Sequence, residues 1–308
     1  MSRPGRVAVV GVTAGGKSAV ALAAARLLGE LEIVSVDAMQ VYRGMDIGTA
    51  KPTRAERAEV RHHCIDLVDP DVAFSVADFV VAYEGALATI AASGHRPLLV
   101  GGTGLYLRAV TDGLDLPGHW PALRAELEAD ADASADAAGL YERLRLLDPV
   151  AAERIEPTNR RRIVRALEVC IGSGRPFSSF GPGLTSYDAS PVVQLGLRWD
   201  RARLAERITQ RVHAMMDAGL LDEVRHLLGR PGGMSRTARQ ALGYRELIEH
   251  LDGDRSLDEA VEAIVVRTRQ FAVRQDRWFR RDPRIRWLDI DSDPVAEALP
   301  FVVEALRG

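Results

Sequence analysis

The chain has 308 residues, of which 47% are hydrophobic and 27% are charged, and its formal net charge is −3. This composition excludes a globally disordered chain, and the net charge means that any nucleic-acid-binding basic surface must be local. Two cysteines cannot build a disulfide framework or a four-cysteine zinc site, and no run of about 18 apolar residues predicts a membrane span, so we expect a soluble cytoplasmic protein.

The first hundred residues alternate short apolar runs with helical segments. Strands are predicted at residues 7–10, 33–36 and 97–100, and helices at residues 19–28, 54–60 and 76–92. Strands that alternate with helices indicate a parallel sheet in an α/β fold. The strand at 33–36 ends at Asp37, whereas the strand at 97–100 ends in Gly101-Gly102-Thr103-Gly104.

The pattern changes after about residue 112, because no convincing buried strand follows until residue 190. Helices are predicted at 121–131, 137–147 and 159–172, followed by a loop at 177–191 that is rich in Ser, Gly and Pro. Strand character returns at 192–199. We therefore predict a small all-helical domain, residues 112–191, inserted into an α/β core formed by residues 1–111 and 192–308.

Helices dominate the C-terminal third. Leu204, Ile208 and Met215 recur near a helical period, and Ser256-Leu257-Asp258-Glu259 fits a capping box. This box opens a long helix that is predicted to reach about Arg281. Residues 285–290 form the last predicted strand.

A Gly-rich segment follows the first strand. Gly11-Val12-Thr13-Ala14-Gly15-Gly16-Lys17-Ser18 satisfies the pattern G-x-x-x-x-G-K-[ST], with a strand before it and a helix after it. In such a loop the backbone N–H groups and the helix N-terminus face phosphate oxygens, Lys17 adds an ammonium, and the Ser18 hydroxyl can ligate Mg²⁺. We therefore predict a P-loop NTPase-like fold, rather than a chance Gly-rich turn, that binds a phosphate group with Mg²⁺.

Asp37 follows a strand at the edge of the sheet where open α/β folds bind their substrates. From the residues alone, it can be a base, a metal-binding group or a cap. The segment His62-His63-Cys64 does not predict a metal site, because adjacent ligands point in different directions and no second pair completes a zinc site. We expect a structural role there, with a strand-to-turn segment at residues 66–70.

At this point the sequence resembles a known family, the tRNA dimethylallyltransferases, in their bacterial form. The P-loop resembles the family's GPTASGKT, although Val12 replaces the usual proline and Gly16 follows Gly15 where a serine or threonine is common. The other matching segments follow in order along the chain: Ser35-Val36-Asp37-Ala38-Met39-Gln40-Val41-Tyr42, Gly44-Met45-Asp46-Ile47-Gly48-Thr49-Ala50-Lys51-Pro52, Gly101-Gly102-Thr103-Gly104-Leu105-Tyr106, Arg165-Ala166-Leu167-Glu168-Val169, Gln240-Ala241-Leu242-Gly243-Tyr244 and Arg274-Gln275.

The resemblance implies an enzyme that transfers a dimethylallyl group from dimethylallyl diphosphate to the exocyclic N6 amine of the adenosine just 3′ of the tRNA anticodon, releasing diphosphate. It implies Asp37, Thr13, Lys17, Thr103 and Arg225 as catalytic residues. It also implies that the P-loop, residues 11–18, binds the diphosphate with Arg211 and Arg225, and that Ser18 holds Mg²⁺. The residues expected to contact the tRNA anticodon stem-loop are Asp37, Ala38, Met39, Gln40, Thr103, Arg161, Arg162, Arg165, Gln240, Gly243, Tyr244, Arg245, Arg274, Gln275 and Trp278.

Other interpretations stay open on the residues themselves. Without the resemblance, Arg211 and Arg225 fit a solvated helix face, and so do the arginine-rich segments 160–165 and 267–281. The rival functions are a P-loop small-molecule or nucleotide kinase, a non-catalytic RNA-binding protein, and a prenyltransferase acting on free AMP-type nucleotides. We expect a monomer that has no membrane partner.

Overall fold

The structure, a computed structural model, describes residues 6–133, 138–180, 184 and 186–308. It divides into two compact units, of which the first is Met1–Asp112 with Ala189–Gly308 and the second is Gly113–Asp188. The second unit lies within the insertion expected at residues 112–191. Each unit has a hydrophobic core of its own, so each is described by itself.

A six-stranded parallel sheet forms the centre of the first unit, in the order β3-β2-β4-β1-β5-β6. This α/β architecture is the one that the sequence predicts. The central strands are buried along nearly their whole length because both faces of a parallel sheet are covered. The strands are β1 (Arg6–Gly11), β2 (Leu31–Val36), β3 (His62–His63), β4 (Arg96–Gly101), β5 (Val192–Trp199) and β6 (Ile285–Ile290).

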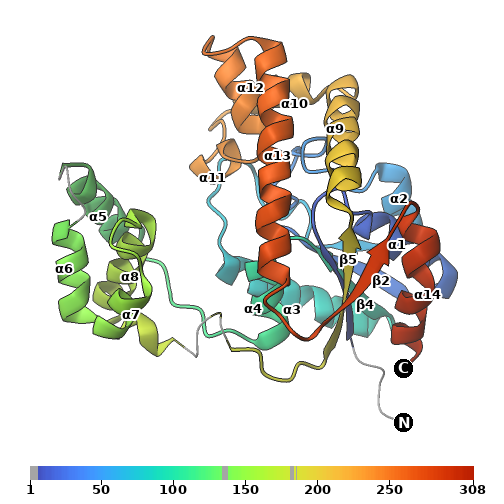
Figure 1. The fold of residues 1–308 in the computed structure, drawn as a ribbon, viewed down its shortest axis with the longest axis horizontal. Helices are drawn as coiled ribbons and strands as arrows, with labels where there is room; N and C mark the ends of the chain where they lie inside the picture. The colour runs from blue at the N-terminus through green and yellow to red at the C-terminus, as the bar shows by residue number, and fades with distance from the viewer. Residues whose placement is uncertain (1–5, 134–137, 181–183, 185) are drawn as a thin grey trace. The chain divides into compact units, whose positions relative to one another are not determined.

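Alternate residues of the strands pack into two separate layers, as the period of two along a strand requires. On one face Val7 and Val9 pack with α1 (Lys17–Leu28) and α14 (Pro294–Arg307), which lie side by side (Figure 1). On the other face Ala8 and Val10 belong to the core that includes α3 (Val76–Ala92) and the long C-terminal helices.

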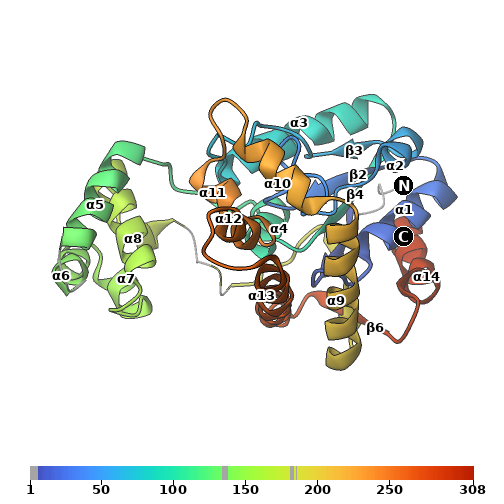
Figure 2. The same cartoon turned by 90° about the horizontal axis from the view of Figure 1, so that it is seen from above.

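Most remaining helices of the first unit stand above or beside the carboxyl edge of the sheet. In Figures 1 and 2, α9 continues from the end of β5 and runs beside α13, with α10 and α12 at the far end of α13. The capping box predicted at Ser256 opens α13, which ends slightly before the predicted Arg281. The helices are α2 (Arg54–Glu59), α4 (Gly104–Asp112), α9 (Arg201–Asp217), α10 (Leu220–Leu228), α11 (Arg236–Arg239), α12 (Tyr244–Leu251) and α13 (Leu257–Phe279).

The second unit is helical, as the sequence predicts. It contains α5 (Pro121–Ala133), α6 (Ala138–Leu147), α7 (Pro149–Arg154) and α8 (Arg160–Ser173), followed by the short η1 (Phe177–Ser179). Leu127, Leu144, Ile163 and Leu167 are buried in its core. The predicted start of a helix at residue 137, and part of the loop predicted at 177–191 (residues 181–183 and 185), lie outside the described residues.

Several elements were not assigned from the sequence, for local reasons. β3 has only two residues, too few to show a periodic pattern, and it pairs with Ile33 and Val34. Pro300 lies inside α14 and obscures its helical pattern, since proline usually ends a helix. No described helix is long and apolar enough to cross a membrane.

Candidate active site

Three loops meet at the carboxyl ends of neighbouring strands. The P-loop follows β1, Asp37 follows β2, and Gly102 and Thr103 follow β4, which pairs with both of the other strands. Substrates of open α/β folds bind at this edge. The sheet order therefore brings together segments that lie up to 90 residues apart in the chain.

The backbone of the P-loop curls tightly before α1. Ala14 and Gly16 have positive φ angles of 58° and 88°, and the Gly15 N–H donates to the Val12 carbonyl at 3.3 Å. The Lys17 ammonium donates to the same carbonyl at 2.7 Å. The lysine is thus held at the mouth of the loop, where a phosphate group would take over its hydrogen bonds.

Two side chains from distant elements hold the outer side of the P-loop. Arg207 of α9 donates through Nε to the Ala14 carbonyl, and Trp199 of β5 donates through Nε1 to the Gly15 carbonyl, both at 3.0 Å. The Arg207 guanidinium also lies 4.3 Å from the centre of the Trp199 ring. These contacts fix the orientation of the two carbonyl groups. The sequence contains no motif that would have identified either residue.

A charged cluster surrounds the P-loop lysine. Burial lowers the pKa of Lys17 to about 8, and the positive charge of Arg211 acts in the same direction, whereas Asp37 opposes the shift. Burial likewise lowers the pKa of Arg211, again opposed by Asp37. The structure therefore brings Lys17, Arg211 and Asp37 together. Two partly buried cations beside one carboxylate leave an excess of positive charge, which suits a polyanion such as a diphosphate.

Arg225, in contrast, is not part of this cluster in the described contacts. Its side chain is exposed on α10 and pairs with Asp222 at 2.9 Å. The catalytic and diphosphate-binding roles that the family resemblance implies for Arg225 stay predictions.

Asp37 has one of the roles left open by the sequence, that of a cap. Its Oδ1 accepts from the N–H groups of Met39 at 2.8 Å and Gln40 at 3.3 Å, so this oxygen caps the turn after β2. The other oxygen, Oδ2, makes no hydrogen bond with the described residues. The Ala38 N–H donates to the Thr103 hydroxyl oxygen at 3.1 Å. The carboxylate is therefore fixed in orientation with one oxygen available to accept a proton.

A carboxylate from α10 holds the loop that follows this turn. Glu223 accepts from three successive backbone N–H groups, those of Asp46, Ile47 and Gly48, at 3.0, 2.7 and 3.2 Å. It also accepts from the Tyr244 hydroxyl at 2.6 Å. The acidic character of Glu223 gave no sign of this role in the sequence. The contact fixes the loop at residues 44–52 to the helices above the sheet.

The donor set near the P-loop fits Mg²⁺. Ser18 is exposed in the first turn of α1, and its hydroxyl makes no hydrogen bond with the described residues. Mg²⁺ keeps several waters and is commonly bound together with substrate phosphates, so Ser18 would supply one protein oxygen beside a bound diphosphate. Among the described residues there is no cluster of three His, Cys, Asp or Glu side chains that could hold a metal by itself.

The histidine pair at the sheet edge has the structural role that the sequence predicts. His62 interacts through Nδ1 with the Val60 carbonyl at 2.7 Å, and His63 interacts through Nε2 with the buried Glu32. His95 contacts the other oxygen of Glu32 at 2.8 Å. The two imidazoles therefore interact with other groups of the protein, the Val60 carbonyl and the Glu32 carboxylate.

Apart from the residues after β2 and β4 described above and Gly243, whose N–H donates to Glu246 at 2.8 Å, the residues predicted to contact tRNA fall into two groups. Arg161, Arg162, Gln240 and Arg274 are exposed and make no ion pair with the described residues, and Arg245 is exposed but pairs with Glu249. The side chains of the second group contact other parts of the protein. Gln40 forms hydrogen bonds with Ser35, Thr49 and Ala50, and Gln275 forms hydrogen bonds with Thr13 and Gly102. Arg165 pairs with the buried Glu168, Tyr244 is fully buried, and Trp278 packs on Gly104. Contact with tRNA stays a prediction for both groups.

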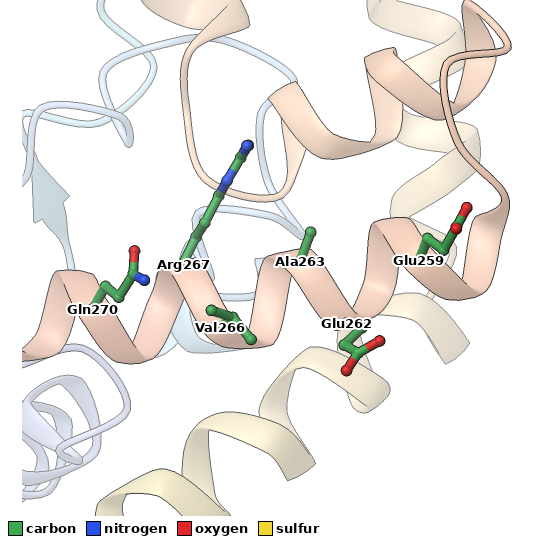
Figure 3. Close-up of a pocket in the computed structure, with 6 residues that line it drawn as sticks. All are labelled: Glu259, Glu262, Ala263, Val266, Arg267 and Gln270. Carbon is green, nitrogen blue, oxygen red and sulfur yellow. The ribbon is translucent and has the colours of Figure 1, made fainter.

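A shallow hollow lies along the amino half of α13 (Figure 3). Its lining runs from Glu259 to Gln270, whereas Gln275, the contact of α13 with the P-loop, lies further along the helix. Arg267, at the start of the arginine-rich segment 267–281, lines it, but none of the residues expected to bind the diphosphate or the anticodon stem-loop does. The hollow is therefore separate from the charged cluster at the carboxyl edge of the sheet.

A family model and individual known proteins that are similar to this chain point to the same family. The IPP transferase family model matches residues 40–282. The chain is 50% identical over 299 residues to the tRNA dimethylallyltransferase of Pseudarthrobacter chlorophenolicus, covering 97% of this chain and 98% of that protein. It is 47% identical over 285 residues to the tRNA dimethylallyltransferase of Geobacter metallireducens, covering 92% of each.

Solved structures show the same likeness. A tRNA isopentenylpyrophosphate transferase from Bacillus halodurans is similar with a TM-score of 0.69 and 38% identity, covering 99% of this chain and 97% of the other. A eukaryotic dimethylallyltransferase acting on tRNA is similar with a TM-score of 0.78 and 25% identity, covering 97% of this chain and 77% of the other.

Proposed function

The chain belongs to the IPP transferase family, and from this premise we propose that it is a tRNA dimethylallyltransferase, a prenyl-transferring enzyme that modifies tRNA. In its full form, the proposal is that the donor is dimethylallyl diphosphate and the acceptor is the N6 amine of the adenosine on the 3′ side of the anticodon. The observation that carries it is the cluster of Lys17, Arg211 and Asp37 at the carboxyl edge of the sheet.

The donor half of the site is suited to a diphosphate leaving group. P-loop N–H groups, the Lys17 ammonium and the Arg211 guanidinium are placed before the reaction, so they stabilise the charge that develops on the diphosphate as the bond to carbon breaks. When bound at Ser18, Mg²⁺ would supply additional neutralisation of that charge.

The acceptor half is suited to an amine that must lose a proton. The bond between the C1 carbon and the diphosphate oxygen breaks, its electron pair leaves with diphosphate, and C1 forms a bond to N6. The proton released from N6 passes to Asp37, whose Oδ2 is free among the described residues and whose Oδ1 is fixed by Met39. The adenine must leave the stacked anticodon loop to reach this edge of the sheet.

The experiment that tests the function is incorporation of labelled dimethylallyl diphosphate, with Mg²⁺, into total tRNA and, separately, into AMP. We expect label in tRNA, lost in Lys17→Ala and Asp37→Asn and retained in Arg26→Ala, which changes an exposed arginine on the same helix as Lys17. Sequencing of the labelled tRNA position tests the anticodon assignment.

Each other result supports a different interpretation. Label in AMP alone would assign the chain to free-nucleotide prenylation. ATP turnover without label in either acceptor would support the kinase, and tRNA binding without any turnover would support the non-catalytic RNA-binding protein.

A further inference from the structure

The Gln275 side chain connects two loops of the site. It extends from α13, is 7% exposed, and uses both ends of its amide. Its Oε1 accepts from the Thr13 N–H of the P-loop at 2.8 Å, and its Nε2 donates to the Gly102 carbonyl at 2.9 Å. A Cβ atom at position 102 would lie 2.5 Å from Nε2, so the glycine there leaves room for this bridge.

The second loop continues to the acceptor half of the site. Thr103 follows Gly102, and its hydroxyl oxygen accepts from the Ala38 N–H at 3.1 Å, directly after Asp37. One amide group thus joins the donor half, represented by Thr13, to the acceptor half, represented by Thr103 and Asp37. No other described side chain bonds both Thr13 and Gly102.

We propose that Gln275 is a positioning residue that fixes the separation of the P-loop and the Asp37–Thr103 loop, so that the two substrates meet in a reactive geometry. This inference depends on the proposed function. A glutamine fits because the bridge needs one acceptor and one donor at the two ends of a planar group. Methionine has a similar length and neither group, and glutamate lacks the donor.

The expected consequence is a loss of rate without a loss of binding. Transfer requires the reacting atoms to approach to about 3–3.5 Å in line, and a misplacement of about 1 Å can cost about 100-fold in rate. The diphosphate would still be held by Lys17 and the P-loop N–H groups. Arg274, the exposed residue that precedes Gln275, would remain available to tRNA.

The test uses Gln275→Met and Gln275→Glu, with Gln270→Met as a matched control, since Gln270 is an exposed glutamine on the same helix. Single-turnover rates are measured with both substrates saturating. Binding of inorganic diphosphate and of tRNA is measured separately by calorimetry. We expect the rate in Gln275→Met to fall about 10- to 100-fold, both dissociation constants to stay within about threefold of wild type, and Gln270→Met to match wild type.

Other outcomes would overturn the proposal. A weaker affinity for tRNA with an unchanged saturated rate would make Gln275 a tRNA contact, and unchanged rate and binding would leave it with a packing role alone. If Gln275→Met does not fold, Gln275→Asn, which keeps the amide but is too short to span both loops, provides the same comparison. Absence of transfer by the wild type would instead count against the proposed function.

Discussion

At the scale of single residues, the two adjacent glycines of the P-loop differ in what they require. Gly16 has a φ of 88°, and a Cβ atom there would lie 2.4 Å from Pro294. At Gly15 the nearest atom to an added Cβ would be the Val12 carbonyl oxygen at 3.0 Å. The family's serine or threonine near this point therefore fits at Gly15 with a small adjustment, but not at Gly16.

We expect Gly15→Ser to change the free energy of unfolding by less than about 1 kcal/mol, because the backbone there needs no left-handed conformation. Gly16→Ser should lower the free energy of unfolding by about 3 kcal/mol, because its φ would be strained and its side chain would overpack against Pro294. Urea unfolding of both variants measures this difference. Adding Pro294→Ala to Gly16→Ser should recover only the steric part, and equal stability of the two single variants would contradict the explanation.

Lys17 gives the donor site a pH dependence. Burial and Arg211 hold the pKa of its ammonium at about 8 in the free protein, and a bound diphosphate favours the charged form and so raises this pKa. Below about pH 8 the lysine is already protonated and its contribution to affinity is complete. Above it, binding must take up a proton, so affinity falls by about tenfold per pH unit until the pKa of the complex is reached.

Calorimetric titration of inorganic diphosphate between about pH 7 and pH 9.5 checks this expectation, because two buffers of different ionisation enthalpy report the proton uptake directly. Lys17→Met should bind more weakly, and because diphosphate itself titrates in this range, the difference in proton uptake between wild type and Lys17→Met isolates the contribution of the lysine. An affinity that stays constant across this range in the wild type would contradict it.

At the scale of elements, α8 carries arginines with opposite environments. Arg161 and Arg162 are exposed, whereas Arg165 pairs at 2.9 Å with Glu168, which is 0% exposed. The Trp120 N–H donates to the same glutamate at 3.0 Å. The first turn of α8 therefore exposes two arginines to solvent, whereas Arg165 of the same helix stabilises the second unit through its ion pair.

We expect Arg161→Ala with Arg162→Ala to weaken tRNA binding about tenfold and to reduce the slope of log affinity against log salt by about 2, with little change in stability. Arg165→Ala should instead lower the free energy of unfolding by about 2 kcal/mol, because it removes a partner from a buried carboxylate. Filter binding at several salt concentrations and urea unfolding separate the two effects. The reverse assignment of effects would show that Arg165 is the tRNA contact.

At the scale of the whole molecule, the second unit is an insertion, and the two segments of the first unit that flank it are hydrogen-bonded to each other. The Ser190 hydroxyl donates to the Thr111 carbonyl at 3.1 Å, so the chain leaves and re-enters the first unit at neighbouring points. Each unit also has a core of its own. A short linker could therefore replace the insertion without straining the sheet.

We expect a variant in which a short Gly/Ser linker replaces residues 113–188 to fold and to bind inorganic diphosphate within about threefold of the full chain, since the P-loop and its supports lie in the first unit. Its affinity for tRNA should fall at least about tenfold, because Arg161 and Arg162 are removed. Calorimetry and filter binding measure the two ligands. Unchanged tRNA affinity would show that the first unit alone holds the tRNA.

Features that are encoded in a local pattern could be predicted before the structure was known. The P-loop, the α/β alternation and the start of α13 at Ser256 could be predicted, because each is encoded within a few consecutive residues. Asp37 was recognisable for the same reason, as an acid at the end of a buried strand. The order of strands β3-β2-β4-β1-β5-β6 was not predictable, because it depends on pairing between distant segments.

The support of the P-loop depends on contacts that form only when distant segments of the chain come together. Thr13 is separated from Gln275 by 262 residues, Ala14 from Arg207 by 193 and Gly15 from Trp199 by 184. No local pattern records such pairs, since each depends on one arginine, tryptophan or glutamine on an otherwise ordinary helix or strand. The sheet brings these side chains to one edge, and their hydrogen bonds to loop backbone then set the geometry on which catalysis depends.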